Sequence, residues 1–132
     1  MSTSNSRPHP TSLSEPFWAA AREGHLALQR CSECGSYRWT PQVLCINCHS
    51  EAYEWTPVSG RGRVYSYSIV HRAPTSEFES PYVVAVVELD EGPLMLTNIV
   101  GCSLDAVRVG MPVEVALRPL DDQITLYPFR PA

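Results

Sequence analysis

Apolar and polar residues alternate most clearly in the second half of the chain, where they predict a series of short β-strands. In the first of these, Tyr65, Tyr67 and Ile69 share one face and serines occupy the other, which is typical of a half-buried strand. The second is a run rich in β-branched residues, which indicates a central position in a sheet. The five expected strands are 64–71, 82–87, 94–100, 113–117 and 124–127, with one helical turn over 104–107.

The bends between these strands suggest how the sheet closes. Five strands with a short helical insert between the third and the fourth describe an OB-type barrel, which we expect over residues 55–132. Gly110-Met111-Pro112 fits a corner of such a barrel. Gly60-Arg61-Gly62-Arg63 is interpreted as a flexible, basic corner that leads into the first strand. The predicted fold is therefore mainly β.

A short helix is predicted before the barrel. Ser14 is a candidate N-cap, Pro16 suits the first turn, and Gly24 ends the helix. Phe17 and Trp18 give this helix a large apolar side. They either pack on the chain's own ribbon or anchor into a partner protein, because exposed aromatic residues mark interfaces.

The segment after the helix carries the clearest chemical motif. Cys31, Cys34, Cys45 and Cys48 form two Cys-x-x-Cys pairs separated by ten residues. Two such pairs place four thiolates at the corners of a tetrahedron, the geometry that Zn²⁺ prefers in structural sites. Gly35 follows the second cysteine, where a left-handed backbone is often required. Residues 12–54 are therefore expected to form the helix and a zinc ribbon, and the polar residues 1–11 a disordered tail.

Other interpretations of the cysteines stay open. Two disulfides would satisfy the same four residues, although the chain shows no secretory signal. Iron is accepted by four thiolates as readily as zinc. His49 lies beside the last cysteine and could replace a ligand, or it could be a solvated loop residue. Cys102 has no cysteine near it in sequence and is expected to be a small buried residue.

Composition narrows the class of protein. With 132 residues, the chain can form one compact domain and a small appendage. It contains no apolar run of the roughly 20 residues that a membrane span requires, and we expect a cytoplasmic location. The formal net charge is −4, which argues against general binding to nucleic acid. All ten basic residues are arginines, whose planar groups recognise phosphate and carboxylate.

No catalytic set can be identified from spacing. Ser-Gly and Gly-Arg-Gly are too short to be phosphate-binding loops. Glu88, Asp90 and Glu91 lie beside a turn, where solvated acids are usual. His71 and Arg72 end the first barrel strand and are equally explained as solvated residues. The residues alone describe a binding module without an active site of its own.

The order of the motifs resembles one known family. The matching stretches are Cys31-Ser32-Glu33-Cys34-Gly35, Cys45-Ile46-Asn47-Cys48, Val58-Ser59-Gly60-Arg61-Gly62, Tyr65-Ser66-Tyr67, His71-Arg72-Ala73-Pro74, Pro81-Tyr82-Val83-Val84-Ala85, Val87-Glu88-Leu89-Asp90-Glu91-Gly92, Val109-Gly110-Met111-Pro112-Val113 and Phe129-Arg130-Pro131. Together they resemble DUF35, a family of zinc-ribbon OB-fold proteins associated with acyl-CoA. The family often has Pro-Pro-Arg before the third cysteine and proline after it, whereas this chain has Thr40-Pro41-Gln42 and Ile46.

The resemblance implies an accessory role. Members of the family associate with thiolase-fold enzymes in thiolysis, acyl transfer or retro-aldol cleavage, and the partner supplies the catalytic groups. We therefore expect a noncatalytic, zinc-containing subunit of a heteromeric thiolase- or aldolase-type complex that handles a CoA thioester during degradation of a bulky acid. Arg61, Arg63, His71 and Arg72 are the candidate contacts to CoA or the partner.

Two other functions remain to be distinguished. The first is a stand-alone OB-fold nucleic-acid-binding protein in which Tyr65 and Tyr67 stack on bases. The second is a redox carrier with iron bound by the cysteines, which the colour of the purified protein would reveal.

Overall fold

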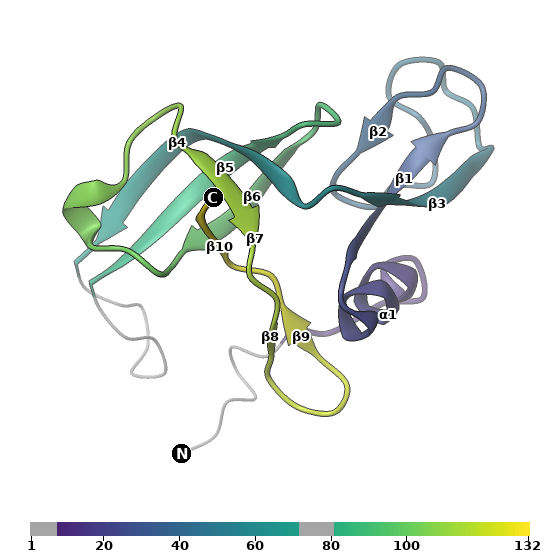
Figure 1. The fold of residues 1–132 in the computed structure, drawn as a ribbon. Coiled ribbons are helices and arrows are strands. Elements are labelled where there is room, and N and C mark those ends of the chain that lie inside the picture. Colours follow the sequence, from purple (N-terminus) through teal and green to yellow (C-terminus); the bar gives the residue numbers. More distant parts are fainter. Residues whose placement is uncertain (1–7, 72–80) are drawn as a thin grey trace.

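A computed structural model describes residues 8–71 and 81–132 of the chain. One helix, α1 (Glu15–Glu23), precedes a three-stranded sheet, and a closed barrel follows (Figure 1). The predicted class, mainly β with a short helix, a ribbon and a five-stranded OB-fold barrel, is confirmed. Most of the predicted tail, residues 1–7, lies outside the described residues, and so does Arg72.

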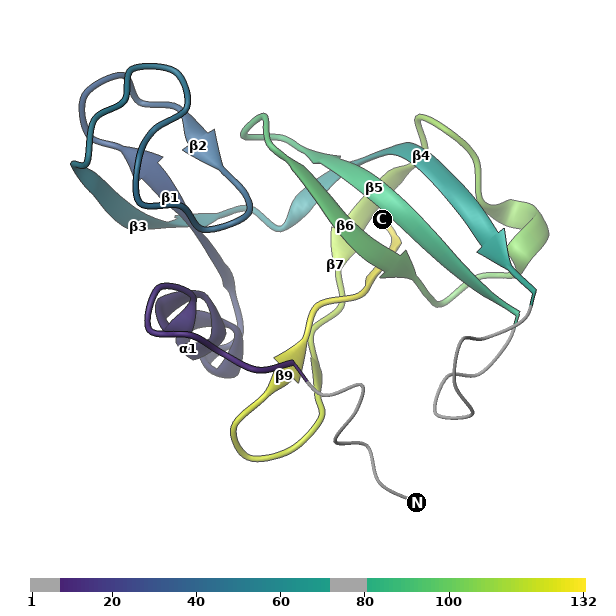
Figure 2. The ribbon, with the colours of Figure 1, turned by 180° about the vertical axis from the view of Figure 1, so that it is seen from behind.

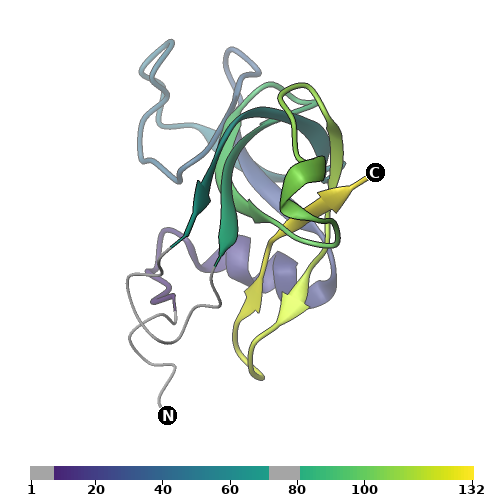
Figure 3. The same cartoon turned by 90° about the vertical axis from the view of Figure 1, so that its left-hand side faces the viewer.

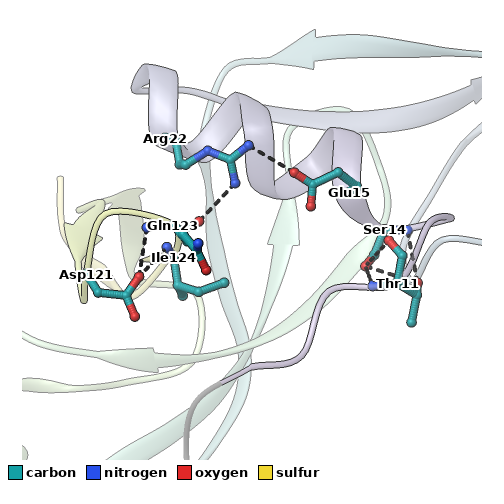
Figure 4. Close-up of polar contacts among 7 residues, drawn as sticks. All are labelled: Thr11, Ser14, Glu15, Arg22, Asp121, Gln123 and Ile124. Atoms are coloured by element: carbon teal, nitrogen blue, oxygen red, sulfur yellow. Dashed lines mark hydrogen bonds and ion pairs between the residues drawn. The ribbon is translucent and has the colours of Figure 1, made fainter. Parts of the chain in front are cut away.

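Helix α1 begins after a turn that the sequence did not predict. Ser14 occupies the N-cap position, but its side chain makes no cap hydrogen bond to the helix. Instead, the N–H of Thr11 donates to Ser14 Oγ at 2.9 Å, and the N–H of Ser14 donates to Thr11 Oγ1 at 3.1 Å (Figure 4). The predicted N-cap position of Ser14 is therefore confirmed, but its side chain bonds to Thr11 rather than to the first turn of the helix. Gly24 ends the helix with φ of 103°, as predicted.

The ribbon contains a small antiparallel sheet. Its central strand is β1 (Leu26–Cys31), which pairs with β2 (Tyr37–Arg38) on one side and β3 (Tyr53–Val58) on the other. Leu26 and Leu28 are buried, so β1 also contributes to the core. The strand ends at the first cysteine and thus fixes the position of the metal-binding motif.

The barrel has the strand order β10-β6-β5-β4-β7. Its elements are β4 (Arg61–Val70), β5 (Tyr82–Leu89), β6 (Leu94–Ile99), β7 (Pro112–Val115) and β10 (Phe129–Pro131), with a short 3-10 helix, η1 (Leu104–Ala106), between β6 and β7. Seen from the η1 side, the strands curve around a common interior (Figure 3). The buried residues on the inner face include Val64, Val87, Met95, Val113 and Phe129.

The fifth barrel strand is not the one that the sequence predicted. Residues 124–127 contain β9 (Thr125–Leu126), which pairs with β8 (Arg118–Pro119) in a separate hairpin. That hairpin lies beside α1 (Figures 1 and 2). Phe129 of β10 closes the barrel instead, opposite Ile99 of β6 and Val115 of β7. The apolar run was detected correctly, but it packs on the helix.

The expected flexible corner at residues 60–63 is part of the barrel seam. Strand β4 begins at Arg61 and pairs with β7 through residues 61–63. A Cβ on Gly62 would lie 2.3 Å from the carbonyl oxygen of Glu88, and Gly60 has φ of 74° beside Val115. Both glycines are needed for close backbone approach within the barrel, so flexibility is the wrong explanation.

A β-bulge changes the faces predicted for the first barrel strand. The register between β4 and β5 shifts between Val64 and Ser66, so Tyr65 is an extra residue. Tyr67 lies opposite Ala85, in register with the inner face, although it is 39% exposed, whereas Tyr65 is 57% exposed and lies beside the outward-facing Ser66. The expectation that Tyr65 and Tyr67 share a half-buried face is therefore wrong, because a bulge reverses the alternation after it.

A buried aromatic cluster joins α1, the ribbon and the segment before β10. The Phe17 ring lies 4.5 Å from Trp39, 5.1 Å from Trp18 and 5.2 Å from Tyr127, measured between ring centroids. Phe17 is 0% exposed and Trp18 is 8% exposed. Buried side chains cannot serve as exposed anchors for a partner, so that prediction is wrong. The alternative, packing on the chain's own ribbon, holds for the contact with Trp39, whereas Tyr127 lies outside the ribbon.

Candidate metal centre and its surroundings

Two turns of similar geometry present the four cysteines. In the first, the N–H of Gly35 donates to the carbonyl of Cys31 at 2.9 Å. In the second, the N–H of His49 donates to the carbonyl of Cys45 at 2.8 Å. Gly35 has φ of 77° and His49 has φ of 62°, so both occupy the left-handed region. The left-handed backbone predicted at Gly35 is confirmed, and the second turn places a histidine where the first has glycine.

The four sulfur atoms converge on one point. All four Sγ atoms lie within 4.8 Å of one another, with Cys31 and Cys48 separated by 3.5 Å and Cys34 and Cys45 by 3.6 Å. A tetrahedral metal with bonds of about 2.3 Å would hold its sulfur ligands ~3.8 Å apart. All four cysteines are free thiols, which excludes the disulfide alternative in this structure. The arrangement therefore fits one metal ion with four thiolate ligands.

Backbone N–H groups in both cysteine turns favour the thiolate form of the first cysteine of each pair. The N–H groups of Cys48 and then Asn47 point at the sulfur of Cys45 and lower its pKa to about 5. The N–H of Cys34 is the largest influence on Cys31 and lowers the pKa of that thiol as well. For Cys48, the N–H of Ser50 favours the thiolate, but the hydrogen bonds with the sulfur atoms of Cys31, Cys45 and Cys34 outweigh it and raise the pKa to about 12. A divalent cation would displace this last proton, because metal ligands bind deprotonated.

The four cysteines complete the ligand set. Among the described residues, they are the one close group of His, Cys, Asp and Glu that could hold a metal, and His49 is not part of it. Four protein ligands leave no open coordination position for substrate. Cys102 is half-buried against the core and lies apart from this group.

A buried polar group that the sequence analysis missed fixes the ribbon loop. Gln29 Oε1 accepts hydrogen bonds from Arg38 Nε at 2.9 Å and from the N–H of Gln42 at 2.7 Å. Arg38 also donates to the carbonyl of Gln42 at 3.1 Å and lies over the ring of Tyr53. A glutamine within an otherwise apolar segment is the one part of this group that is visible in the sequence. These bonds hold the loop between the two cysteine turns.

The structure separates the residues predicted to contact CoA. Arg61 and Arg63 are exposed at the start of β4, and His71 is exposed just after its end. Eight residues of extended strand span roughly 26 Å, so Arg63 and His71 do not form one site. Arg72 lies outside the described residues.

A shallow pocket lies beside α1, and its polar residues serve to connect the helix to a neighbouring loop. Arg22 donates to Glu15 at 2.9 Å and to the carbonyl of Gln123 at 2.9 Å, and the N–H groups of Gln123 and Ile124 donate to Asp121 (Figure 4). Glu15, Arg22, Gln123 and Ile124 line the pocket. The contacts connect the helix to the loop between β8 and β9.

No helix in the described part of the chain is long and apolar enough to span a membrane.

Family models match both halves of the chain. Residues 18–54 match the rubredoxin-like zinc ribbon domain of ChsH2, and residues 55–118 match the C-terminal OB-fold domain of ChsH2.

Three relatives illustrate the range of named proteins. The probable enoyl-CoA hydratase alpha subunit of Thermomonospora curvata is 41% identical over 96% of this chain, but the chain spans only 40% of that protein. A DUF35 domain-containing scaffold protein of Methanocaldococcus jannaschii is 36% identical over 76% of each chain. The benzoylsuccinyl-CoA thiolase subunit BbsA of Geobacter metallireducens is 34% identical, covering 69% of this chain and 60% of BbsA.

One solved structure extends the similarity to the whole fold. A chain of the Ltp2-ChsH2(DUF35) aldolase superimposes with a TM-score of 0.86 and 39% identity, covering 95% of this chain and 98% of that one. The ribbon, the barrel, the four-cysteine centre and these relatives agree: this chain is a member of the DUF35 family, built from a rubredoxin-like zinc ribbon and an OB-fold domain.

Proposed function

We propose that this protein is a noncatalytic subunit of a heteromeric thiolase-like or aldolase complex that acts on acyl-CoA thioesters. The observation that carries the proposal is its near-complete match to a chain of the Ltp2-ChsH2(DUF35) aldolase. Relatives named as a thiolase subunit and as a hydratase alpha subunit support the same class of substrate. Degradation of a bulky acid, by thiolysis or by retro-aldol cleavage in the cytoplasm, fits these names best.

The chemistry of the described residues supports an accessory role. Their one close group of metal-binding side chains is saturated with four cysteines. An acyl-transfer enzyme needs a nucleophile with an adjacent base, and the catalytic groups in this proposal belong to the partner. The partner is a thiolase-fold enzyme subunit.

We assign zinc to the four cysteines as a structural metal. Zinc closes the ribbon by joining two turns that are otherwise held by few backbone hydrogen bonds, and it contributes folding free energy directly. Cys31 and Cys45 are buried, whereas Cys34 and Cys48 are exposed. Elemental analysis should find one zinc per chain, and iron in its place would support the redox carrier instead.

The exposed arginines at the start of β4 are proposed contacts of the CoA ester. Arg61 and Arg63 lie on consecutive outward positions of the strand, since Gly62 between them faces the interior. Guanidinium groups bind phosphate through paired, charged hydrogen bonds. If they hold CoA, Arg61→Ala and Arg63→Ala should raise the Michaelis constant of the complex severalfold and leave zinc content and Tm unchanged. Wild-type kinetics in both variants would assign CoA binding to the partner.

Binding to nucleic acid is not proposed for this chain. Its net charge of −4 opposes association with a polyanion. The named relatives act in enzyme complexes or are called scaffold proteins.

Co-expression with a thiolase-like protein from the same organism tests the proposal. The two chains should copurify, and the purified complex should cleave or transfer an acyl-CoA. The isolated chain should turn over none of the tested esters. Turnover by this chain alone, free of other enzymes, would refute the accessory role.

A further inference from the structure

The outer face of the three-stranded part of the barrel carries an unusual set of side chains. The face is formed by β4, β5 and β6, and no other described element crosses it in Figure 2. The opposite, inner face of these strands is filled by buried residues such as Ala85, Val87 and Met95. An antiparallel sheet with one buried face normally presents polar residues to water on the other.

The strand register identifies which side chains share this outer face. Residues directly opposite in antiparallel strands point to the same side. Ser66 lies opposite Val86, which lies opposite Leu96; on either side of this row are two others, Arg63–Glu88–Leu94 and Ser68–Val84–Asn98. The bulge residue Tyr65 joins the central row because its neighbours oppose Val86 and Val87. The face is therefore a grid with apolar side chains in its centre.

Exposure shows that this apolar centre is open. Leu96 is 61% exposed, Tyr65 is 57% exposed and Leu94 is 42% exposed. Val84 and Val86 lie between them and are half-buried. Arg63, Glu88 and Asn98 stand at the margins. An apolar centre with an aromatic residue and a polar rim is the composition of a protein–protein interface.

We propose that this outer face, defined by Tyr65, Val84, Val86, Leu94 and Leu96, is the surface on which the thiolase-like partner enzyme docks. The inference rests on the proposed function, which supplies the partner. Other OB folds use an outer strand face to bind oligonucleotides, for which they need cations and stacking rings. Here one arginine is offset by one glutamate directly opposite it, so the face has no net charge to attract phosphates. The charge-neutral apolar centre fits an apolar patch on a folded protein.

The docking face binds the partner in this proposal, whereas the aromatic cluster around Phe17 packs the chain internally. Phe17 and Trp18 are buried and hold the chain together, whereas Leu96 and Tyr65 are exposed and Tyr65 makes no aromatic contact with any described residue. The proposal also gives Arg63 a position at the margin of the docking face. A CoA ester held by Arg63 would therefore bind at the edge of the interface between the two proteins.

A matched pair of substitutions tests the proposal. Leu96→Asp places a charge at the centre of the face, and Val109→Asp places one at a site outside it that is similarly exposed, 65% against 61%. Each variant is co-expressed with the thiolase-like protein and its affinity for the partner is measured. Leu96→Asp should weaken the complex at least tenfold, and Val109→Asp should bind like wild type. Zinc content and Tm establish that each variant is folded.

Further variants keep the test decisive. Leu96→Arg should act like Leu96→Asp, since either charge is costly when desolvated. If a charged variant fails to fold, Tyr65→Ala replaces it and should weaken binding severalfold. Copurification of folded Leu96 and Tyr65 variants at wild-type affinity would overturn the docking face while leaving the proposed function intact. Failure of the wild type to bind the partner would overturn both.

Self-association is the remaining outcome. Sedimentation of the isolated wild-type chain should show a monomer with an exposed face. A dimer that Leu96→Asp dissociates would show that the face binds a second copy of the chain, which would overturn the assignment to a partner enzyme.

Discussion

Replacing Phe17 with alanine separates the two interpretations of the N-terminal helix. The ring is fully buried and contacts aromatic side chains of the helix, the ribbon and the segment before β10. Removing a buried phenylalanine costs about 3–5 kcal/mol, because the surroundings collapse only partly into the cavity. Small domains have about 5–15 kcal/mol of unfolding free energy in total, so this loss is a large fraction.

The measurement is denaturant unfolding of Phe17→Ala followed by circular dichroism. The midpoint should fall substantially, with a thermal shift of about 10 °C or more. Tyr67→Ala is the control, since Tyr67 is a partly exposed aromatic residue, and it should change the unfolding free energy by less than about 1 kcal/mol. If Phe17→Ala kept wild-type stability and lost only the partner, the helix would be a partner anchor and the structural interpretation would be refuted.

Three further substitutions test local geometry. Cys34→Ser should lose the metal and lower Tm, and elemental analysis showing a full complement of zinc would contradict the assigned ligand set. Gly62→Ala should destabilise the barrel by about 1–3 kcal/mol, because the new Cβ would meet the carbonyl oxygen of Glu88; chemical denaturation measures the loss, and wild-type stability would disprove the close approach. Gly35→Ala should lower the free energy of unfolding by about 1–2 kcal/mol, because alanine disfavours the left-handed backbone at this position, whereas His49→Gly should leave it unchanged or raise it. Thermal unfolding in excess zinc compares the two variants. Equal shifts in Tm would show that the two turns do not share the same requirement for a left-handed residue.

The metal centre could be predicted from the sequence because its ligands are close in the chain. Two residues separate the cysteines within each pair, so local turn geometry fixes most of the site, and the structure needed only to bring two turns together. The glycine at position 35 also allowed the left-handed backbone of the first turn to be predicted. The buried bonds between Gln29 and Arg38 could not be predicted in the same way, because they depend on the pairing of β1 with β2.

The barrel strands were predictable as a series but not in every detail. Period-two alternation located β4, and a run of β-branched residues located β5. The bulge at Tyr65 leaves no signal in composition, and one extra residue changes the face of the side chains on one side of it. Strand β10 is three residues long and includes a proline, so its sequence is a weak signal for a strand. The fifth strand was therefore predicted at the longer apolar run 124–127 before it.

The burial of the aromatic residues in α1 could be predicted from the sequence, but the residues that cover them could not. Large apolar residues on a short helix indicate burial, but the pattern does not say whether the chain itself or another protein covers them. Phe17 is covered by Trp39 and Tyr127, which come from distant parts of the sequence. Leu94 and Leu96 fall within the predicted strand 94–100, and only the register shows that they share a face with Tyr65.

The central claim is that this chain is required by a catalytic partner and performs no chemistry of its own. Its most direct test is a titration of the purified protein into a fixed amount of the thiolase-like enzyme, with acyl-CoA turnover as the readout. The rate should rise with added chain and saturate at a fixed molar ratio, and chain alone should give no turnover. A partner enzyme that is fully active without this chain, and unchanged by it, would contradict the claim.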